Sequence, residues 1–221
     1  MAFRSKIQDY LTKKNYSLIN HNPDYRANIF PFIKRLYSRN KQLKIAEYLT
    51  ITSIVKKLCD KKKGNLAEVG VFVGTTAKAI AEMKGNNPLY LFDTFEGLPR
   101  PTKEDEGEFI ESFFSNTSLE SVKHYLKDYP NINLYTGLFP DSAPQEIKDK
   151  KFIFVHLDVD LYESTTNCLG YFYDRMEKGG IILSHDYNNH IGVRKAFDRF
   201  FKDKDEIVIA LPTTQCLVVK L

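Results

Sequence analysis

Acidic side chains stand at the ends of several apolar, strand-like segments of this 221-residue chain. Glu68, Asp93, Asp158 and the pair His185-Asp186 each lie at or just after such a segment. In open α/β sheets the carboxyl ends of the strands meet at one edge, where ligands bind. Like charges gathered there repel one another unless a cation neutralises them. Asp158, His185 and Asp186 therefore form a candidate site for a divalent cation.

The types of ligand narrow the choice of cation. Three nearby residues each have more than one possible role. Carboxylate oxygens suit Mg²⁺, Ca²⁺ or Mn²⁺, whereas an imidazole shifts the preference toward Mn²⁺, Fe²⁺ or Zn²⁺. His185 can act as a cation ligand, a proton shuttle or a donor to a substrate. Asp160 either joins the acids or N-caps the helix that begins at Leu161. His156 lies inside a strand and is expected to be buried and hydrogen-bonded rather than a ligand.

A second candidate binding element is the spacing Glu68-x-Gly70-x-x-x-Gly74, followed by a helix with Thr75 or Thr76 as its expected N-cap. Glycine lets the backbone approach a ligand, and the first turn of a helix offers free N–H groups. Neither G-x-G-x-x-G nor a Walker lysine is present, which disfavours a nicotinamide oxidoreductase. The spacing resembles the first motif of S-adenosylmethionine-dependent methyltransferases.

The elements that must position these residues are strands alternating with helices, a pattern typical of a mostly parallel sheet. Gly179-Gly180 is expected to end the helix that contains Met176. The turn after Leu211 is too short for a crossover, so the last two strands are expected to form an antiparallel hairpin. Strands are predicted at 66–73, 89–92, 132–136, 152–157, 181–183, 206–211 and 215–219, and helices at 42–58, 75–84, 118–128, 161–176 and 191–202.

Two further features point to a binding site at the same edge. Asp93 ends the second strand, where a doubly wound fold holds a ribose diol, because paired hydroxyls donate to one carboxylate. Capping of the following turn is the alternative for this side chain. Residues 97–112 form a loop too long to be a simple connection and are predicted to cover the substrate, with disorder as the alternative.

Composition places the chain among ordinary globular proteins, with 43% hydrophobic and 27% charged residues. A net charge of +4 is small beside 32 basic and 28 acidic groups, so no nucleic-acid partner is expected. No apolar run is long enough to span a membrane, and the N-terminus lacks the pattern of a signal peptide. Cys59, Cys168 and Cys216 lie in apolar patterns, which predicts reduced core residues in a cytoplasmic protein.

Four blocks of sequence, in this order, resemble the macrocin O-methyltransferase family, whose members methylate sugar hydroxyls in antibiotic biosynthesis. The resemblance runs from about Asn65 to Phe201. The blocks are Glu68–Val71 with Gly74, Leu91–Pro99, His156–Thr165, and Gly179–Ile182 leading to Asp186-Tyr187. The closing hairpin also matches the Rossmann-like methyltransferase fold, so the resemblance implies a seven-stranded, mostly parallel sheet with extra N-terminal helices.

The resemblance implies a domain division and a set of binding residues. Residues 63–221 are expected to form the methyltransferase domain, and residues 1–62 a helical segment that acts as a lid or makes oligomer contacts. A divalent cation, Mg²⁺ or Mn²⁺, is implied at Asp158, His185 and Asp186, although the family has Asp-Asp where this chain has His185-Asp186. S-adenosylmethionine is implied at Glu68, Gly70, Gly74, Thr75, Asp93, Thr94, Phe95 and Gly97.

The leading functional hypothesis is metal-assisted transfer of a methyl group to a hydroxyl, expected on a sugar or glycoside, with Asp158 as the base. A homo-oligomer is expected, because the N-terminal segment is rich in aromatic residues. One alternative is metal-independent transfer with His185 as the base. The other is a non-catalytic protein that binds S-adenosylmethionine.

Overall fold

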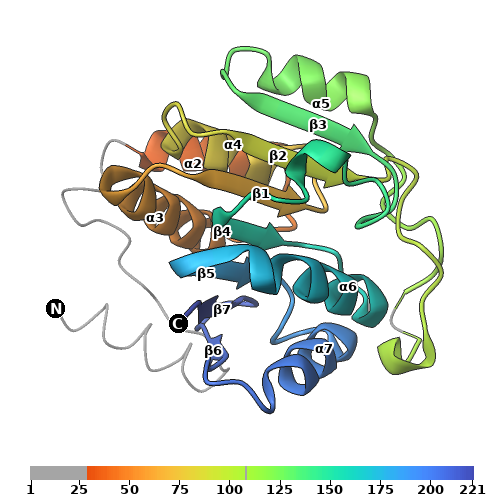
Figure 1. Ribbon diagram of the computed structural model, residues 1–221. Coiled ribbons are helices and arrows are strands. Elements are labelled where there is room, and N and C mark those ends of the chain that lie inside the picture. The colour runs from red at the N-terminus through yellow and green to blue at the C-terminus, as the bar shows by residue number, and fades with distance from the viewer. Residues whose placement is uncertain (1–28, 108) are drawn as a thin grey trace, which may run out of the picture.

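Seven strands form one sheet in the order β3-β2-β1-β4-β5-β7-β6 (Figure 1). The computed structural model describes residues 29–107 and 109–221. Strands β1 to β5 run parallel, and β7 pairs antiparallel with both β5 and β6. The strands are β1 Asn65–Val69, β2 Leu89–Asp93, β3 Ile132–Thr136, β4 Phe152–Leu157, β5 Met176–Ser184, β6 Ile209–Ala210 and β7 Cys216–Val219. The predicted mostly parallel sheet with a C-terminal antiparallel hairpin is confirmed.

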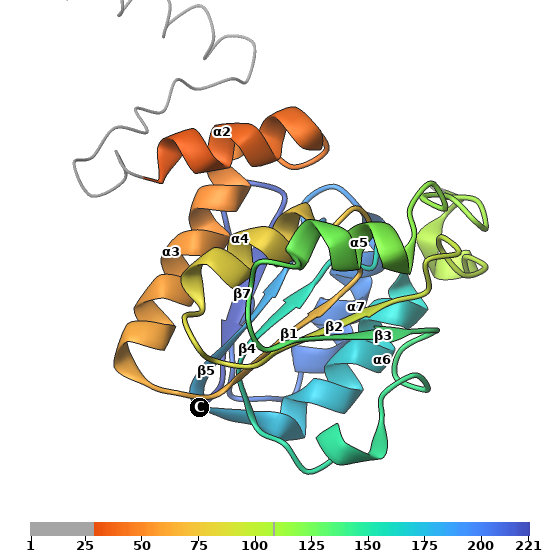
Figure 2. The same cartoon turned by 90° about the horizontal axis from the view of Figure 1, so that it is seen from above.

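Helices cover both faces of the sheet (Figure 2). One layer contains α3 (Ile45–Lys61), α4 (Thr75–Met83) and α5 (Leu119–Leu126), and α2 (Phe30–Arg39) packs on α3 and α4 (Figure 2). The other contains α6 (Tyr162–Phe172) and α7 (Ile191–Phe201). Successive side chains of a strand point to opposite faces. In β2, Leu89 and Leu91 pack against the first layer, and Tyr90 and Phe92 pack against the second.

Burial on both faces explains why the central strands were recognisable in the sequence. All six residues of β4 are buried, as a near-continuous apolar run requires. Strands β2, β3 and β4 begin at the predicted residues. The hydrophobic pattern therefore placed the elements that carry the candidate site.

The first strand ends earlier than predicted. β1 stops at Val69, because Gly70 (φ 84°) and Phe72 (φ 48°) have left-handed backbone conformations that cannot continue a strand. The N-cap of α4 is Gly74, so the prediction that Thr75 or Thr76 caps this helix is wrong. Both threonines lie in the first helical turn and are buried. The strand therefore leads into a loop of residues 70–74 before the helix begins.

The prediction that Gly179-Gly180 ends a helix is also wrong. Helix α6 already ends at Phe172, and both glycines and Met176 belong to β5. The register between β4 and β5 shifts between Phe152 and Phe154. A β-carbon on Gly180 would lie 3.1 Å from the carbonyl oxygen of Phe152, so this irregular part of the strand requires close backbone approach.

In the described part of the predicted N-terminal segment, α3 packs on the sheet and α2 packs on α3 and α4. Ile33 of α2 and Ile51 and Val55 of α3 are fully buried in the same cluster as residues of β1, β2 and β4. Residues 1–28, on which the predicted homo-oligomer largely rested, lie outside the described residues. The domain boundary near residue 62 stays a prediction. Within residues 29–107 and 109–221, no helix has the length and apolar character needed to cross a bilayer.

Candidate active site

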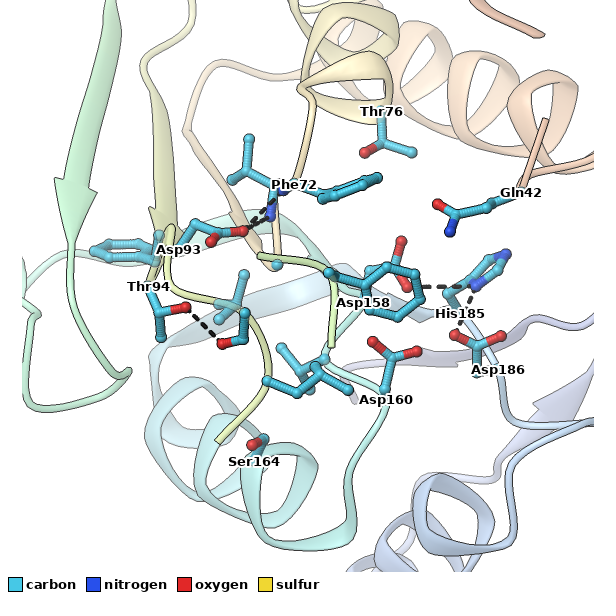
Figure 3. A pocket seen from close by; sticks show the side chains of 18 of the residues that line it. Gln42, Phe72, Thr76, Asp93, Thr94, Asp158, Asp160, Ser164, His185 and Asp186 are labelled. Atoms are coloured by element: carbon cyan, nitrogen blue, oxygen red, sulfur yellow. Dashed lines mark hydrogen bonds and ion pairs between the residues drawn. The ribbon is translucent and has the colours of Figure 1, made fainter. Parts of the chain in front are cut away.

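A cavity of about 360 Å³ opens at the carboxyl ends of the parallel strands (Figure 3). Its walls come from the β1–α4 loop, the residues after β2, β4 and β5, and residues 40–44 before α3. Glu68, Gly74 and Phe95 do not line it. Of the residues predicted from the sequence, those that do are Gly70, Thr75, Asp93, Thr94, Gly97, Asp158, His185 and Asp186.

The Asp93 carboxylate organises the loop after β1. Its Oδ2 accepts hydrogen bonds from the backbone N–H groups of Val71 (2.7 Å) and Phe72 (2.8 Å), and its Oδ1 accepts one from Phe95 (2.7 Å). Asp93 therefore caps the turn that follows it, as one of the two predictions for this side chain proposed. Since each carboxylate oxygen has more than one acceptor site, the side chain retains capacity for a ligand hydroxyl.

The segment after β2 is a tight turn at the cavity wall. The Thr94 hydroxyl donates to the carbonyl oxygen of Gly97 (2.8 Å) and accepts from the N–H of Glu96 (3.2 Å). Gly97 has φ 91°, and a β-carbon there would lie 2.6 Å from the carbonyl oxygens of Ser112 and Phe113. This position therefore requires glycine both for its backbone conformation and for space.

Glu68 is enclosed by protein atoms. Its carboxylate is 0% exposed, and its Oε1 lies 2.9 Å from Nδ1 of His156, which is also 0% exposed. Burial raises the pKa of Glu68, while the hydrogen bond to His156 opposes that rise. The expectation that His156 is buried and hydrogen-bonded is confirmed. The predicted contact of Glu68 with a cofactor stays a prediction.

The three residues predicted to hold a cation meet at one wall of the cavity (Figure 3). Nδ1 of His185 lies 2.8 Å from Oδ2 of Asp186 and 3.3 Å from Oδ1 of Asp158. His185 and Asp186 are 7% and 5% exposed. Asp186 has φ 65°, a left-handed conformation that is unusual for a residue other than glycine. Backbone strain of this kind gathers at functional sites, because the surrounding structure must enforce it.

Electrostatics couples these groups. Burial alone would lower the pKa of His185, but the carboxylates of Asp158, Asp186 and Glu47 outweigh it and raise that pKa well above its usual value. Burial alone would raise the pKa of Asp186, but the imidazole of His185 brings it down to about 2. Without another cation, the His185 ring is therefore the positive charge that offsets the acids.

Asp160 belongs to the site, although the sequence left its role open. It lines the cavity with φ 58°, and the N-cap of α6 is Leu161. Asp105 instead accepts a hydrogen bond from the N–H of Tyr162 (2.7 Å) at that helix end. Burial, together with the charges of Asp186 and Asp158, raises the pKa of Asp160 well above its usual value. In the sequence, the Asp-x-Asp spacing directly after β4 was the feature that indicated a second carboxylate at this site.

Two contacts on the other side of the His185 ring were not predicted from the sequence. Nε2 of His185 lies 3.1 Å from the hydroxyl of Thr214, in the turn between β6 and β7, and 3.5 Å from Oε2 of Glu47 in α3. Glu47 is 1% exposed. Neither residue belongs to a motif, and 167 positions separate them in the chain.

The donor atoms fit a divalent cation. One ligand atom from each of Asp158, His185 and Asp186 lies within 4.8 Å of the others. His185 Nδ1 is buried and has no hydrogen-bond partner, although two carboxylates lie near it. When the ring is neutral with its hydrogen on Nε2, Nδ1 and the two carboxylates are all acceptors, an arrangement that a cation would stabilise. Asp160, Asp186 and His190 form a second such group, which shares Asp186 with the first.

The loop after β2 closes over the cavity rim and is tied to the second helix layer. Leu98 and Phe114 line the cavity, and the N–H of Leu98 donates to the carbonyl oxygen of Phe113 (2.8 Å). Lys195 of α7 forms an ion pair with Glu104 of the loop (3.5 Å). The role of residues 97–112 in covering an acceptor stays a prediction.

A model of the macrocin O-methyltransferase (TylF) family matches residues 48–215, a range that includes the cavity residues from Val69 to Thr214 but not residues 40–44 or Glu47. The chain is 27% identical to 8-demethyl-8-(2,3-dimethoxy-alpha-L-rhamnosyl)-tetracenomycin-C 4'-O-methyltransferase of Streptomyces olivaceus, in a match that covers 59% of this chain. It spans only 55% of the length of that relative.

Two solved structures share the fold. The O-methyltransferase NovP superposes with a TM-score of 0.66 at 21% identity, over 80% of each chain. The calicheamicin methyltransferase CalS11 superposes with a TM-score of 0.67 at 16% identity, over 90% of this chain and 94% of that one. The sheet order with its antiparallel β7, the glycine loop and the match over most of its length show that this chain belongs to the macrocin O-methyltransferase family, with the Rossmann-like methyltransferase fold.

Proposed function

We propose that this protein transfers the methyl group of S-adenosylmethionine to a hydroxyl of a sugar or glycoside, assisted by a divalent cation. The observation that carries the proposal is the meeting of Asp158, His185 and Asp186 in the wall of a cavity that Gly70 and Asp93 also line. Family membership supports the reaction class. The Streptomyces relative, named for methylation of a rhamnosyl group, supports a sugar as the acceptor.

The cavity lining suits S-adenosylmethionine, which supplies the methyl group on a positively charged sulfur. Asp93 and Thr94 offer oxygens for hydroxyl groups, and Phe72 and Leu98 offer apolar surface. Hydrogen bonds that Asp93 accepts from backbone N–H groups fix the loop after β1, so the backbone there is held in place before a ligand arrives. Holding the two reactants in line at short distance is the main contribution that we assign to this side of the cavity.

The acids of the opposite wall would activate the acceptor. A divalent cation held by Asp158, His185 and Asp186 would lower the pKa of a bound hydroxyl. The acceptor oxygen then forms a bond to the methyl carbon, the bond from carbon to sulfur breaks, and the hydroxyl proton passes to a carboxylate. We assign this base role to Asp158. Asp160 is a neighbouring carboxylate, so variants of both residues are needed to tell their roles apart.

The rival in which His185 is the base is not favoured by the charges around the ring. Burial lowers the pKa of His185, but its three acidic neighbours outweigh burial and raise that pKa, which favours the protonated ring when no metal is bound. A protonated ring cannot accept a proton from the acceptor hydroxyl.

The test combines binding with turnover. Calorimetric titration of S-adenosylmethionine into chelator-stripped protein, repeated with Mn²⁺ and with Mg²⁺, should show micromolar cofactor binding and a saturable cation site. Asp158→Asn should abolish methyl transfer to a panel of sugars and glycosides while cofactor affinity remains, and Asp160→Asn shows whether its carboxylate shares the role. Cofactor binding without transfer to any acceptor would favour the non-catalytic alternative. Absence of cofactor binding would overturn the proposal.

A further inference from the structure

Three side chains from distant parts of the chain form a row that ends at the candidate cation site. The row begins at Glu47 in α3, passes through Thr214 in the turn between β6 and β7, and ends at His185 after β5. The Thr214 hydroxyl donates to Oε1 of Glu47 (2.7 Å) and lies 3.1 Å from Nε2 of His185. Glu47 and His185 are 1% and 7% exposed, so water does not compete strongly for these bonds.

The direction of the hydrogen bonds follows from the chemistry of Glu47. Its Oε2 accepts from the backbone N–H of Lys44, and its Oε1 accepts from both the N–H and the hydroxyl of Thr214. A carboxylate that only accepts is in its ionised form. Because the single hydroxyl hydrogen of Thr214 points to Glu47, the Thr214 oxygen can only accept from His185. Nε2 of His185 therefore carries a hydrogen atom.

The other ring nitrogen is then the one available for a cation. Nδ1 faces Asp158 and Asp186 and has no hydrogen-bond partner. We infer that Glu47 and Thr214 are positioning residues that fix the His185 ring with Nε2 protonated and Nδ1 directed between the two acids, so that Nδ1 is a nitrogen ligand of the divalent cation. This inference rests on the proposed function.

The chain offers a matched control next to Thr214. The hydroxyl of Thr213 exchanges hydrogen bonds with its neighbour Gln215, donating to the side-chain oxygen and accepting from the backbone N–H, both at 3.2 Å. Thr213→Val and Thr214→Val each replace one hydroxyl by a methyl group in the same turn. Only Thr214→Val removes the hydroxyl that lies against Nε2 of His185, and it leaves the direct 3.5 Å contact of Nε2 with Oε2 of Glu47.

The first measurement is Mn²⁺ affinity of the chelator-stripped full-length protein, read from the electron paramagnetic resonance signal of free Mn²⁺. We expect Thr214→Val to weaken Mn²⁺ binding about tenfold or more, as is common when the hydrogen-bond partner of a metal ligand is removed. Thr213→Val and Thr214→Ser, which keeps the hydroxyl, should bind as the parent does. Equal affinity in Thr214→Val and Thr213→Val would overturn the inference.

The second measurement needs no variant, so a folding defect in Thr214→Val does not leave the question open. In protein labelled with ¹⁵N-histidine and saturated with Zn²⁺, long-range ¹H–¹⁵N spectra should show a proton on Nε2 of His185 and a metal-bound Nδ1. A proton on Nδ1 in the saturated protein would overturn the inference.

The same samples separate this inference from the function that it assumes. A parent protein that binds S-adenosylmethionine and transfers methyl groups but has no Mn²⁺ site would overturn the ligand role of His185 alone. A parent protein that fails to bind S-adenosylmethionine would overturn the proposed function first.

Discussion

The backbone of Gly70 lies directly against the backbone of Asp158: a β-carbon on residue 70 would stand 1.8 Å from the Asp158 carbonyl oxygen. This contact joins the glycine loop after β1 to the first acid after β4. Gly70 also has φ 84°, which favours glycine. This close approach adds to the pairing of β1 with β4, which holds the cofactor side and the acidic side of the cavity in register.

Gly70→Ala should consequently disturb both sides of the cavity. We expect a loss of more than about 2 kcal/mol in the free energy of unfolding, because overpacking adds to the cost of a left-handed alanine. Affinity for S-adenosylmethionine should fall at least about tenfold, the equivalent of 1.4 kcal/mol. Urea unfolding and calorimetric titration measure the two effects.

Gly85→Ala is the control for the backbone term in that experiment. Gly85 has φ 59°, yet a β-carbon there would meet no atom within 4 Å. The control should lose only about 1–2 kcal/mol and keep its cofactor affinity. Similar losses in both variants would contradict the importance of the contact with Asp158.

Asp93→Asn should loosen the loop after β1. The carboxylate accepts three backbone hydrogen bonds, and the amide of asparagine replaces one acceptor oxygen with a donor that faces N–H groups. We expect a loss of about 1–3 kcal/mol in stability and a weaker affinity for S-adenosylmethionine. Asp128→Asn, at an exposed position, should change neither quantity. Parental affinity in Asp93→Asn would show that the loop does not depend on this carboxylate.

His185→Asp should change which cation the protein prefers. The parent site contains one imidazole nitrogen, which favours Mn²⁺ over Mg²⁺, whereas the variant would offer only carboxylate oxygens. The ratio of Mn²⁺ to Mg²⁺ affinity, measured by calorimetry, should therefore fall in the variant. An unchanged ratio would mean that His185 is not a ligand.

The same variant should respond to chelation more strongly than the parent. In the parent the His185 ring offsets the charges of Asp158 and Asp186, and its removal leaves three acids together. We expect the melting temperature of His185→Asp to fall on addition of a chelator and to recover with Mg²⁺. The parent should show the smaller change.

Asp105→Ala should release the loop after β2 from α6. Oδ1 of Asp105 accepts from the N–H of Tyr162, and Oδ2 accepts from the N–H and the hydroxyl of Thr102. Loss of this cap should cost about 1–2 kcal/mol, and the KM for the acceptor should rise more than the KM for S-adenosylmethionine. Limited proteolysis should cleave the loop faster.

Glu106→Ala is the matched control for the loop. Glu106 pairs with Lys195 at the surface and is 60% exposed at its side chain, and exposed ion pairs contribute little to stability. Its KM values and cleavage rate should remain those of the parent. If both variants behave alike, Asp105 is not the anchor of the loop.

The sequence predicted the meeting of Asp158, His185 and Asp186 because parallel strands end at one edge of their sheet. The strands themselves were readable, since burial on both faces leaves near-continuous apolar runs such as β4. Where backbone conformation decides the structure, prediction failed. The left-handed Gly70 and Phe72 end β1 early, and a left-handed Asp160 places its carboxylate at the cavity rather than at a helix end.

By itself, then, the sequence determined the order of the strands along the chain, the glycine loop and the line of acids at the strand ends, because these depend on local pattern. Only the tertiary structure decided what each side chain contacts. Glu47 and Thr214 lie 167 positions apart and share one hydrogen bond, which depends on how α3 and the last hairpin pack around β5. Glu68 is paired with His156 on the neighbouring strand β4, a contact that the sequence did not predict. Packing between distant segments decides such contacts, so they cannot be predicted from local sequence.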